Sequence, residues 1–170
     1  MTIQPGQRVP SVPIKLVSVD GVSDVSSADV LGSGTVVFFT VPGAFTPTCH
    51  LNHLPGFVEN VERFAMAGVD RIVCGTVNDQ HVVKAWAEAT GALGKIDFIA
   101  DGLAKLAREM GLERDLSGGG LGIRFIRSAL IIEDGVVTLV NLETVPGEVS
   151  GSGAGAILEA LSAERHQAIG

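Results

Sequence analysis

The order of strands and helices that the sequence predicts indicates one α/β domain with a mixed sheet. Buried strands alternate with helices through most of the chain, and the alternation ends in a β-hairpin followed by a helix. The length of 170 residues fits about one domain of the usual 100–200 residues. We therefore expect a single domain over residues 1–170, with a central sheet flanked by helices.

The first half of the chain predicts the central strands. Val12–Val19 shows the partial alternation of a strand, and Asp20–Gly21 forms a hairpin turn into the next one. Thr35–Thr40 is an unbroken run that fits a central strand buried on both faces. A loop at Pro42–Thr48 then leads into a helix, which we expect Pro55-Gly56 to interrupt because proline cannot donate a backbone hydrogen bond.

Further strands and helices alternate up to the C-terminus. Arg71–Val77 is a second buried strand, and Asn78 or Asp79 caps the helix that follows to about Thr90. The inner face of that helix is expected to carry Val82, Val83, Trp86 and Ala87. The remaining elements are a strand at Ile96–Ala100, a short helix at Leu103–Met110, a glycine-rich loop at Ser117–Gly122, a hairpin of Arg127–Glu133 and Val136–Leu142, and a last helix after residues 150–155.

Composition excludes several classes of protein. Hydrophobic residues make up 46% of the chain and charged residues 18%, which does not fit a disordered chain or a coiled coil. The net charge of −7 argues against nucleic-acid binding, because an acidic surface repels phosphates. The sequence lacks both a run of about 18 apolar residues and the apolar segment of a signal peptide. We expect a cytoplasmic protein that contacts neither nucleic acid nor membrane.

The loop after the first central strand carries the chemistry. Thr46 followed by Pro47 is the pattern of an N-cap residue and a first-turn proline, which puts Cys49 in the first turn of a helix. Free backbone N–H groups and the positive end of the helix dipole favour a thiolate there. A small buried hydrophobe is the alternative reading of Cys49. The position at the carboxyl end of a central strand favours a reactive thiol.

At this point the residues resemble those of a known family. Pro42-x-x-x-Thr46-x-x-Cys49 is similar to the active-site motif of the peroxiredoxins, and the string PGAFTPTC with HLPGF at His53–Phe57 resembles the type II, peroxiredoxin-5-like branch. The similarity continues through Val77–Asp79 and Arg127–Gly135, so it covers nearly the whole chain. His50 departs from the pattern, because this branch usually carries a small polar residue there.

The resemblance implies a thioredoxin-like fold and reduction of hydrogen peroxide and alkyl hydroperoxides at Cys49. Negative charge grows on both oxygens as the O–O bond breaks, so the site needs fixed hydrogen-bond donors. By family match, Thr46, the Cys49 backbone N–H and Arg127 supply them, and Pro42 shields the thiolate. Without the resemblance, Arg127 reads as a solvated charge at a strand end, and Arg124 is the alternative arginine.

The second cysteine, Cys74, lies 74 − 49 = 25 residues after Cys49, inside a predicted strand. It reads either as a buried core residue or as a resolving cysteine that reaches Cys49 only if the helix partly unwinds. Since residues 141–170 hold no cysteine, we expect a one-cysteine cycle. The expected reductant is glutathione with glutaredoxin, or thioredoxin. The resemblance also implies a homodimer, and the chemistry needs no cofactor.

Other functions fit the sequence less well. Cys49, His50 and His53 give three donors with no fourth to complete a metal site, and their helical spacing is poor for a Cys/His hydrolase. The glycine-rich stretches do not form a G-x-G-x-x-G motif, and Cys49-x-x-Asn52 is not the Cys-x-x-Cys of a disulfide reductase. The remaining alternative is a non-enzymatic redox sensor or binding module that uses oxidation of Cys49 as a switch.

Overall fold

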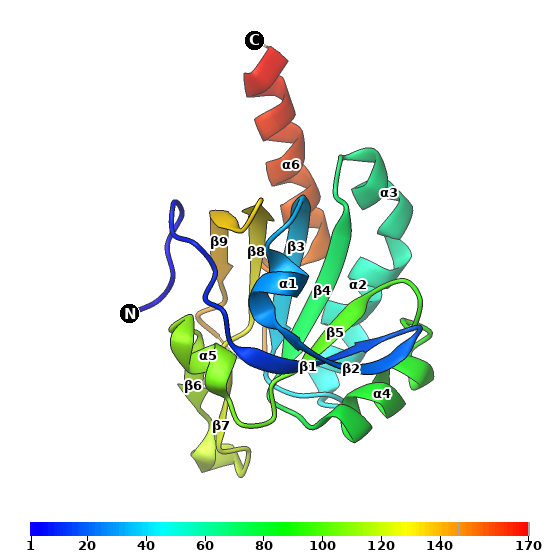
Figure 1. Ribbon diagram of the computed structural model, residues 1–170, viewed down its shortest axis with the longest axis vertical. Helices are drawn as coiled ribbons and strands as arrows, with labels where there is room; N and C mark the ends of the chain where they lie inside the picture. The colour runs from blue at the N-terminus through cyan, green and yellow to red at the C-terminus, as the bar shows by residue number, and fades with distance from the viewer. Residues whose placement is uncertain (146, 170) are drawn as a thin grey trace.

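A mixed sheet forms the centre of the molecule, as the computed structural model shows for residues 1–145 and 147–169 (Figure 1). In this described part, seven strands lie in the order β2-β1-β5-β4-β3-β8-β9. β3, β4 and β5 are parallel and the other pairings are antiparallel, so the predicted mixed sheet is confirmed. The bounds are β1 Pro13–Ser18, β2 Gly21–Ser26, β3 Thr35–Val41, β4 Arg71–Thr76, β5 Asp97–Ala100, β8 Ser128–Glu133 and β9 Val136–Leu142.

Helices cover both faces of this sheet (Figure 1). One core contains Phe39 and residues of α2 (Leu54–Glu59), α3 (Val61–Met66), α4 (Gln80–Ala89) and α6 (Ala154–Ile169). The other contains Phe38 and residues of α1 (Ser27–Leu31) and α5 (Lys105–Glu109). Successive residues of β3 therefore point into different cores, as the period of two in a strand requires. Across residues 1–145 and 147–169, no helix has the length and apolar character needed to cross a membrane.

Asp79 is the cap of α4. Its carboxylate accepts hydrogen bonds from the backbone N–H groups of His81 and Val82, both at 2.9 Å, which settles the choice between Asn78 and Asp79. Trp86 is fully buried on the inner face of the helix, as predicted, whereas Val82 is only half-buried. The side chain of Asn78 instead binds the loop at Pro42–Thr48, where its Oδ1 accepts a hydrogen bond from the Ala44 N–H at 2.9 Å.

The predicted break at Pro55-Gly56 is wrong. A π-helical turn, Cys49–His53, leads into α2, and Pro55 lies in the first turn of α2. The wider turn, in which the Leu54 N–H bonds to the Cys49 carbonyl, ends just before the proline, where a missing N–H costs little. The break between α2 and α3 falls at Asn60, whose backbone leaves the helical region at φ −109° and ψ 15°.

The structure also contains elements that the sequence reading missed. Helix α1 begins with a reciprocal pair of bonds between Ser26 and Asp29, both at 3.1 Å. A small hairpin of β6 (Glu113–Asp115) and β7 (Ile123–Phe125) encloses the glycine-rich loop. Helix α5 is shorter than predicted because Ala104 takes a left-handed conformation with φ 56°.

Candidate active site

Cys49 lies in the first turn of the helix that follows β3, at the carboxyl end of that strand. The helix begins at Pro47, and the His50 N–H donates to the Thr46 carbonyl at 2.9 Å, so the predicted first-turn position is confirmed. The cysteine side chain has no exposed surface. The thiol is therefore enclosed by protein at a helix end where backbone N–H groups favour negative charge.

Arg127 directly contacts the sulfur of Cys49. One guanidinium nitrogen, NH2, donates to Sγ at 3.1 Å, and the side chain is only 2% exposed. The sheet brings the two residues together, since β8 begins one residue after Arg127 and its Ser128 pairs with Thr40 at the end of β3. A buried guanidinium at this distance stabilises a thiolate and is charged at any working pH.

His53 holds the other side of Arg127. Its Nδ1 lies 3.0 Å from NH1 of Arg127 and its Nε2 lies 2.8 Å from the Ser152 carbonyl oxygen. A guanidinium only donates and a carbonyl only accepts, so the proton of His53 must be on Nε2 and Nδ1 must be bare. The pKa of His53 is lowered from 6.5 to about 4, mainly because burial disfavours the charged imidazole; the Ser152 carbonyl raises the pKa, Arg127 lowers it and the Glu143 carboxylate raises it. The imidazole is thus neutral at physiological pH.

From the sequence, His53 is part of the HLPGF motif and a poor candidate for a metal ligand or a hydrolase base, and its contact with Arg127 was not predicted. One signal was available: Cys49 and His53 are four residues apart, a spacing that puts both on one helix face. Among the described residues, no group of three or more histidine, cysteine, aspartate or glutamate side chains is arranged to hold a metal ion.

Thr46 and Pro42 belong to the loop that leads into the helix. The Thr46 hydroxyl donates to the Gly43 carbonyl at 2.6 Å, so its hydrogen is held in the loop while its lone pairs stay available. Pro42 is buried, and its carbonyl accepts from NH1 of Arg124 at 3.2 Å. Arg124 also donates to the Leu121 carbonyl at 2.8 Å. Arg124 therefore ties the Pro42 loop to the glycine-rich loop, and Arg127 is the arginine whose bond to the sulfur is seen.

The imidazole of His50, the residue after Cys49, lies between two aromatic side chains. The Trp86 indole N–H donates to Nδ1 of His50 at 3.0 Å, and the Phe45 ring stacks on the imidazole with centroids 5.6 Å apart. Phe45 is 49% exposed and has a left-handed backbone with φ 61°, which few non-glycine residues adopt. This departure from the usual small residue thus joins the exposed loop to the core.

Cys74 is fully buried in β4, where it pairs with Phe39 of β3. Burial raises the pKa of its thiol well above the ordinary value, Cys49 raises it further, and Arg127 lowers it. Both cysteines are free thiols in the same core. Cys74 is thus near the site but held as a neutral thiol inside the sheet.

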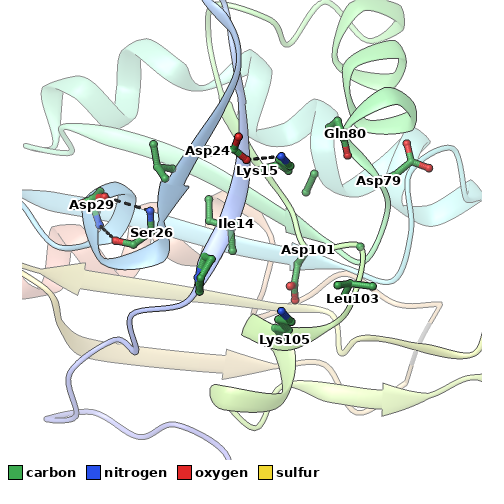
Figure 2. Close-up of a pocket in the computed structure, with 14 residues that line it drawn as sticks. Ile14, Lys15, Asp24, Ser26, Asp29, Asp79, Gln80, Asp101, Leu103 and Lys105 are labelled. Atoms are coloured by element: carbon green, nitrogen blue, oxygen red, sulfur yellow. Dashed lines mark hydrogen bonds and ion pairs between the residues drawn. The ribbon is translucent and has the colours of Figure 1, made fainter.

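A pocket lies away from this site (Figure 2). It is lined by parts of β1, β2 and the segment before α5, including Ile14, Asp24 and Leu103. Lys15 and Asp24 form an ion pair at its side. Cys49, Arg127 and His53 are not among the residues that line this pocket. Recognition of a small peroxide rests on a few placed donors and does not require a large pocket.

Comparisons with known proteins agree on one family. The family model described as Redoxin matches residues 4–158. Peroxiredoxin-2B of Arabidopsis thaliana is 41% identical over 157 residues, 92% of this chain and 96% of the relative. A crystal structure of reduced Prx3 in complex with H₂O₂ from Vibrio vulnificus has a TM-score of 0.89 and 39% identity, and covers 97% of this chain and 99% of that one. Peroxiredoxin 5 from Alvinella pompejana matches with a TM-score of 0.82 and 27% identity over 95% and 99% of the two chains.

A thioredoxin-like sheet with a buried cysteine under an arginine defines an enzyme of the thiol peroxidase class. The chain belongs to the redoxin family and, within it, to the type II peroxiredoxins. The thioredoxin-like fold and the thiol-dependent peroxidase activity predicted from the sequence are confirmed by these relatives, and a non-enzymatic sensor is not favoured.

Proposed function

We propose that Cys49 is the peroxidatic cysteine and that it reduces hydrogen peroxide and alkyl hydroperoxides. The observation that carries this assignment is the 3.1 Å bond from Arg127 to the sulfur, between two buried side chains. A buried guanidinium beside a first-turn cysteine stabilises the nucleophile and is in place for the charge that develops on the peroxide.

The reaction divides into an oxidation and a reduction. The Cys49 thiolate attacks one peroxide oxygen, an S–O bond forms, the O–O bond breaks, and the leaving oxygen takes a proton to give water or an alcohol. Arg127 and the Cys49 backbone N–H donate to the two oxygens, and Pro42 limits the access of water. The Thr46 hydroxyl is not the donor that the sequence predicts, because its hydrogen binds the Gly43 carbonyl, and it instead accepts the O–H of the peroxide. The sulfenic acid then condenses with a thiol with loss of water, and a second thiol releases Cys49 as the thiol and leaves with the first as a disulfide.

The reductant in this proposal is external, either glutathione with glutaredoxin or thioredoxin. Burial and the raised pKa of Cys74 support a one-cysteine cycle, because the thiol is a poor nucleophile and attack on the sulfenic acid needs the Cys49 helix to unwind. Cys74 stays the candidate resolving cysteine if that opening occurs.

A homodimer in the cytoplasm completes the proposal. Phe45 and Leu51 lie beside the site with 49% and 67% of their surfaces exposed, and large exposed apolar side chains suit a subunit interface. The two free cysteines suit a reducing compartment.

The test compares Cys49→Ser and Cys74→Ser with each reductant supplied separately. We expect Cys49→Ser to abolish peroxide consumption with every reductant and Cys74→Ser to keep it. Catalytic turnover by Cys49→Ser would overturn the assignment of the nucleophile. Loss of thioredoxin-linked turnover in Cys74→Ser alone would replace the one-cysteine cycle with an intramolecular disulfide.

A further inference from the structure

A buried carboxylate outside the proposed mechanism belongs to Glu143, which lies beside Arg127 where strand β8 begins and the neighbouring strand β9 ends. Glu143 follows the last residue of β9, and its backbone N–H donates to the Arg127 carbonyl at 2.9 Å. The residue is only 4% exposed. A carboxylate is seldom buried unless hydrogen-bond donors surround it, so we expect several donors around that of Glu143.

Ser150 and Ser152 supply those donors. The Ser150 hydroxyl donates to Oε1 at 2.6 Å and its N–H to Oε2 at 2.7 Å, while the Ser152 hydroxyl donates to Oε2 at 2.7 Å and its N–H at 3.4 Å. All four groups are donors and match an ionised carboxylate, which only accepts. Burial alone raises the pKa of Glu143, but the bonds from Ser150 and Ser152 outweigh it and the pKa is lowered.

These bonds fix the short segment between β9 and α6. The carbonyl of Gly151, between the two serines, accepts from the Asn141 side chain at 2.9 Å, so the segment is held from both sides of its backbone. The next carbonyl, that of Ser152, is the one that accepts from Nε2 of His53. The carboxylate thus sets the position of the acceptor that determines where the His53 proton lies.

We propose that Glu143 is a positioning residue for peroxide reduction, which acts through Ser152 and His53 on Arg127. It holds the Ser152 carbonyl where that oxygen takes the His53 proton, and the bare Nδ1 then fixes one guanidinium nitrogen while the other faces Cys49. This inference rests on the proposed function of Cys49 and Arg127. The carboxylate touches neither substrate nor sulfur, so its effect appears only in how well Arg127 is placed.

The consequence is selective for the peroxide step. When the Ser150–Ser152 segment relaxes, His53 loses its fixed acceptor and its contact with NH1 of Arg127 is no longer fixed. The guanidinium is then less well placed for the charge that grows on the peroxide oxygens, which matters less to a reaction without that charge. Alkylation of Cys49 by iodoacetamide is such a reaction, because it requires a thiolate and no broken O–O bond.

The experiment measures two rate constants for Cys49 in the full chain, one with H₂O₂ and one with iodoacetamide. Both are corrected for the thiolate fraction, which is titrated by absorbance. We expect Glu143→Gln to lower the ratio of the H₂O₂ rate constant to the iodoacetamide rate constant by about tenfold, and Glu143→Ala to lower it by more. A small misplacement of a catalytic group can lower a rate constant by up to about a hundredfold. Glu148→Gln is the matched control, because it removes an exposed charge from the same segment and is expected to keep the wild-type ratio.

A second pair of variants keeps the test valid if Glu143→Ala does not fold. Ser150→Ala and Ser152→Ala each remove one hydroxyl donor, and we expect each to lower the ratio by a few-fold. Wild-type ratios in Glu143→Gln and in both serine variants would overturn the positioning role while the proposed function stands. A wild-type Cys49 that does not react with H₂O₂ would overturn the proposed function and this inference with it.

Discussion

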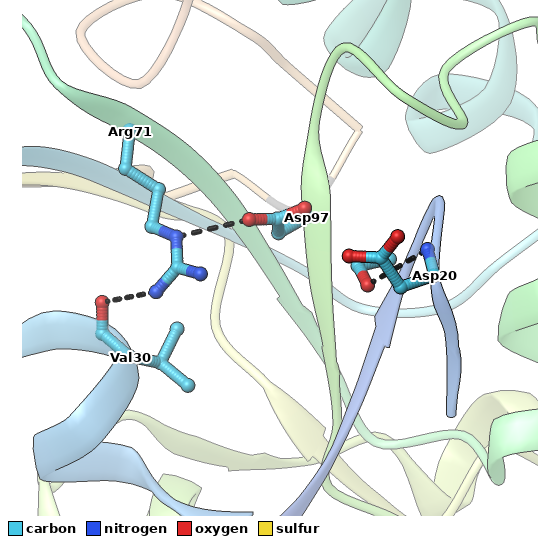
Figure 3. Close-up of polar contacts among 5 residues, drawn as sticks. Asp20, Val30, Arg71 and Asp97 are labelled. Atoms are coloured by element: carbon cyan, nitrogen blue, oxygen red, sulfur yellow. Dashed lines mark hydrogen bonds and ion pairs between the residues drawn. The ribbon is translucent and has the colours of Figure 1, made fainter. Parts of the chain in front are cut away.

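Arginines stand at the two ends of the central sheet and have different partners. Arg71 begins β4, where its Nε donates to Asp97 at 2.9 Å and its NH1 to the Val30 carbonyl of α1 at 3.0 Å (Figure 3). Arg127 precedes β8 at the opposite end of β3, where it donates to Cys49 and His53. Both residues join elements that are distant in the sequence.

The difference lies in what the partners do with the positive charge. Arg71 is 35% exposed and faces a carboxylate, so water and Asp97 neutralise its field. Arg127 is buried, and the imidazole that fixes it is neutral because the pKa of His53 is about 4. His53 therefore does not neutralise the positive charge of Arg127, and one guanidinium nitrogen donates to the sulfur of Cys49. The same type of side chain thus has two roles: Arg71 joins elements of the fold at one end of the sheet, and Arg127 stabilises a nucleophile at the other end.

The largest expected effect comes from Arg127→Lys. The ammonium keeps the charge but is a single point, so it cannot bind His53 and Cys49 with two fixed nitrogens. We expect the rate constant with H₂O₂ to fall by about 10²- to 10³-fold, as for the loss of one donor that stabilises a transition state. Single-turnover kinetics with H₂O₂ measure this rate constant, normalised to the concentration of reactive thiol.

Arg71→Lys is the matched control for that substitution. It changes the same groups at the other end of the sheet, and we expect the peroxide rate constant to stay at the wild-type value. Equal losses in Arg127→Lys and Arg71→Lys would contradict a direct role of Arg127 and point to general damage to the fold.

His53 links the arginine site to acid stability. The unfolded chain binds a proton at this residue below pH 6.5, whereas the folded chain does so only below about 4. Stability is therefore lost as the pH falls from 6.5 to 4 and is unaffected by this group above that window. The loss by pH 4.5 amounts to about 2–3 kcal/mol, since one pKa unit is about 1.4 kcal/mol.

His53→Gln isolates this contribution. Glutamine does not titrate, so the unfolding free energy of the variant should fall less than that of the wild type between pH 7.5 and pH 4.5. We expect the two decreases to differ by about 2–3 kcal/mol. Urea unfolding at both pH values measures the difference, and other acid-sensitive groups cancel. His81→Gln, at an exposed position, is expected to follow the wild type. Parallel curves for wild type and His53→Gln would show that His53 is not held neutral by the fold.

Local patterns were enough to predict one half of the site. Thr46 and Pro47 mark the start of a helix whatever surrounds them, so the position of Cys49 followed from adjacent residues. Arg127 was assigned only by resemblance, because a strand-end arginine has many possible partners. The register of β3 with β8 is what brings it to the sulfur.

The second half depends on contacts that no local pattern encodes. His53 bonds to Ser152, 99 residues away, and the role of Glu143 appears only when β9 and the segment before α6 are folded together. The helix break was misplaced for a similar reason: proline was read as the breaker, but a π-helical turn accommodates Pro55 and the chain bends at Asn60. Helix α1 had a local signal in Ser26 and Asp29 but is only five residues long.

The smallest expected effect completes the comparison of the two arginines. Arg71→Gln removes a half-exposed ion pair, so we expect a loss of about 1 kcal/mol or less in the free energy of unfolding, and less at high salt. The peroxide rate constant should not change. Arg63→Gln, an exposed charge on α3, controls for the change in net charge. A fall in the peroxide rate with Arg71→Gln would mean that the two ends of the sheet are coupled.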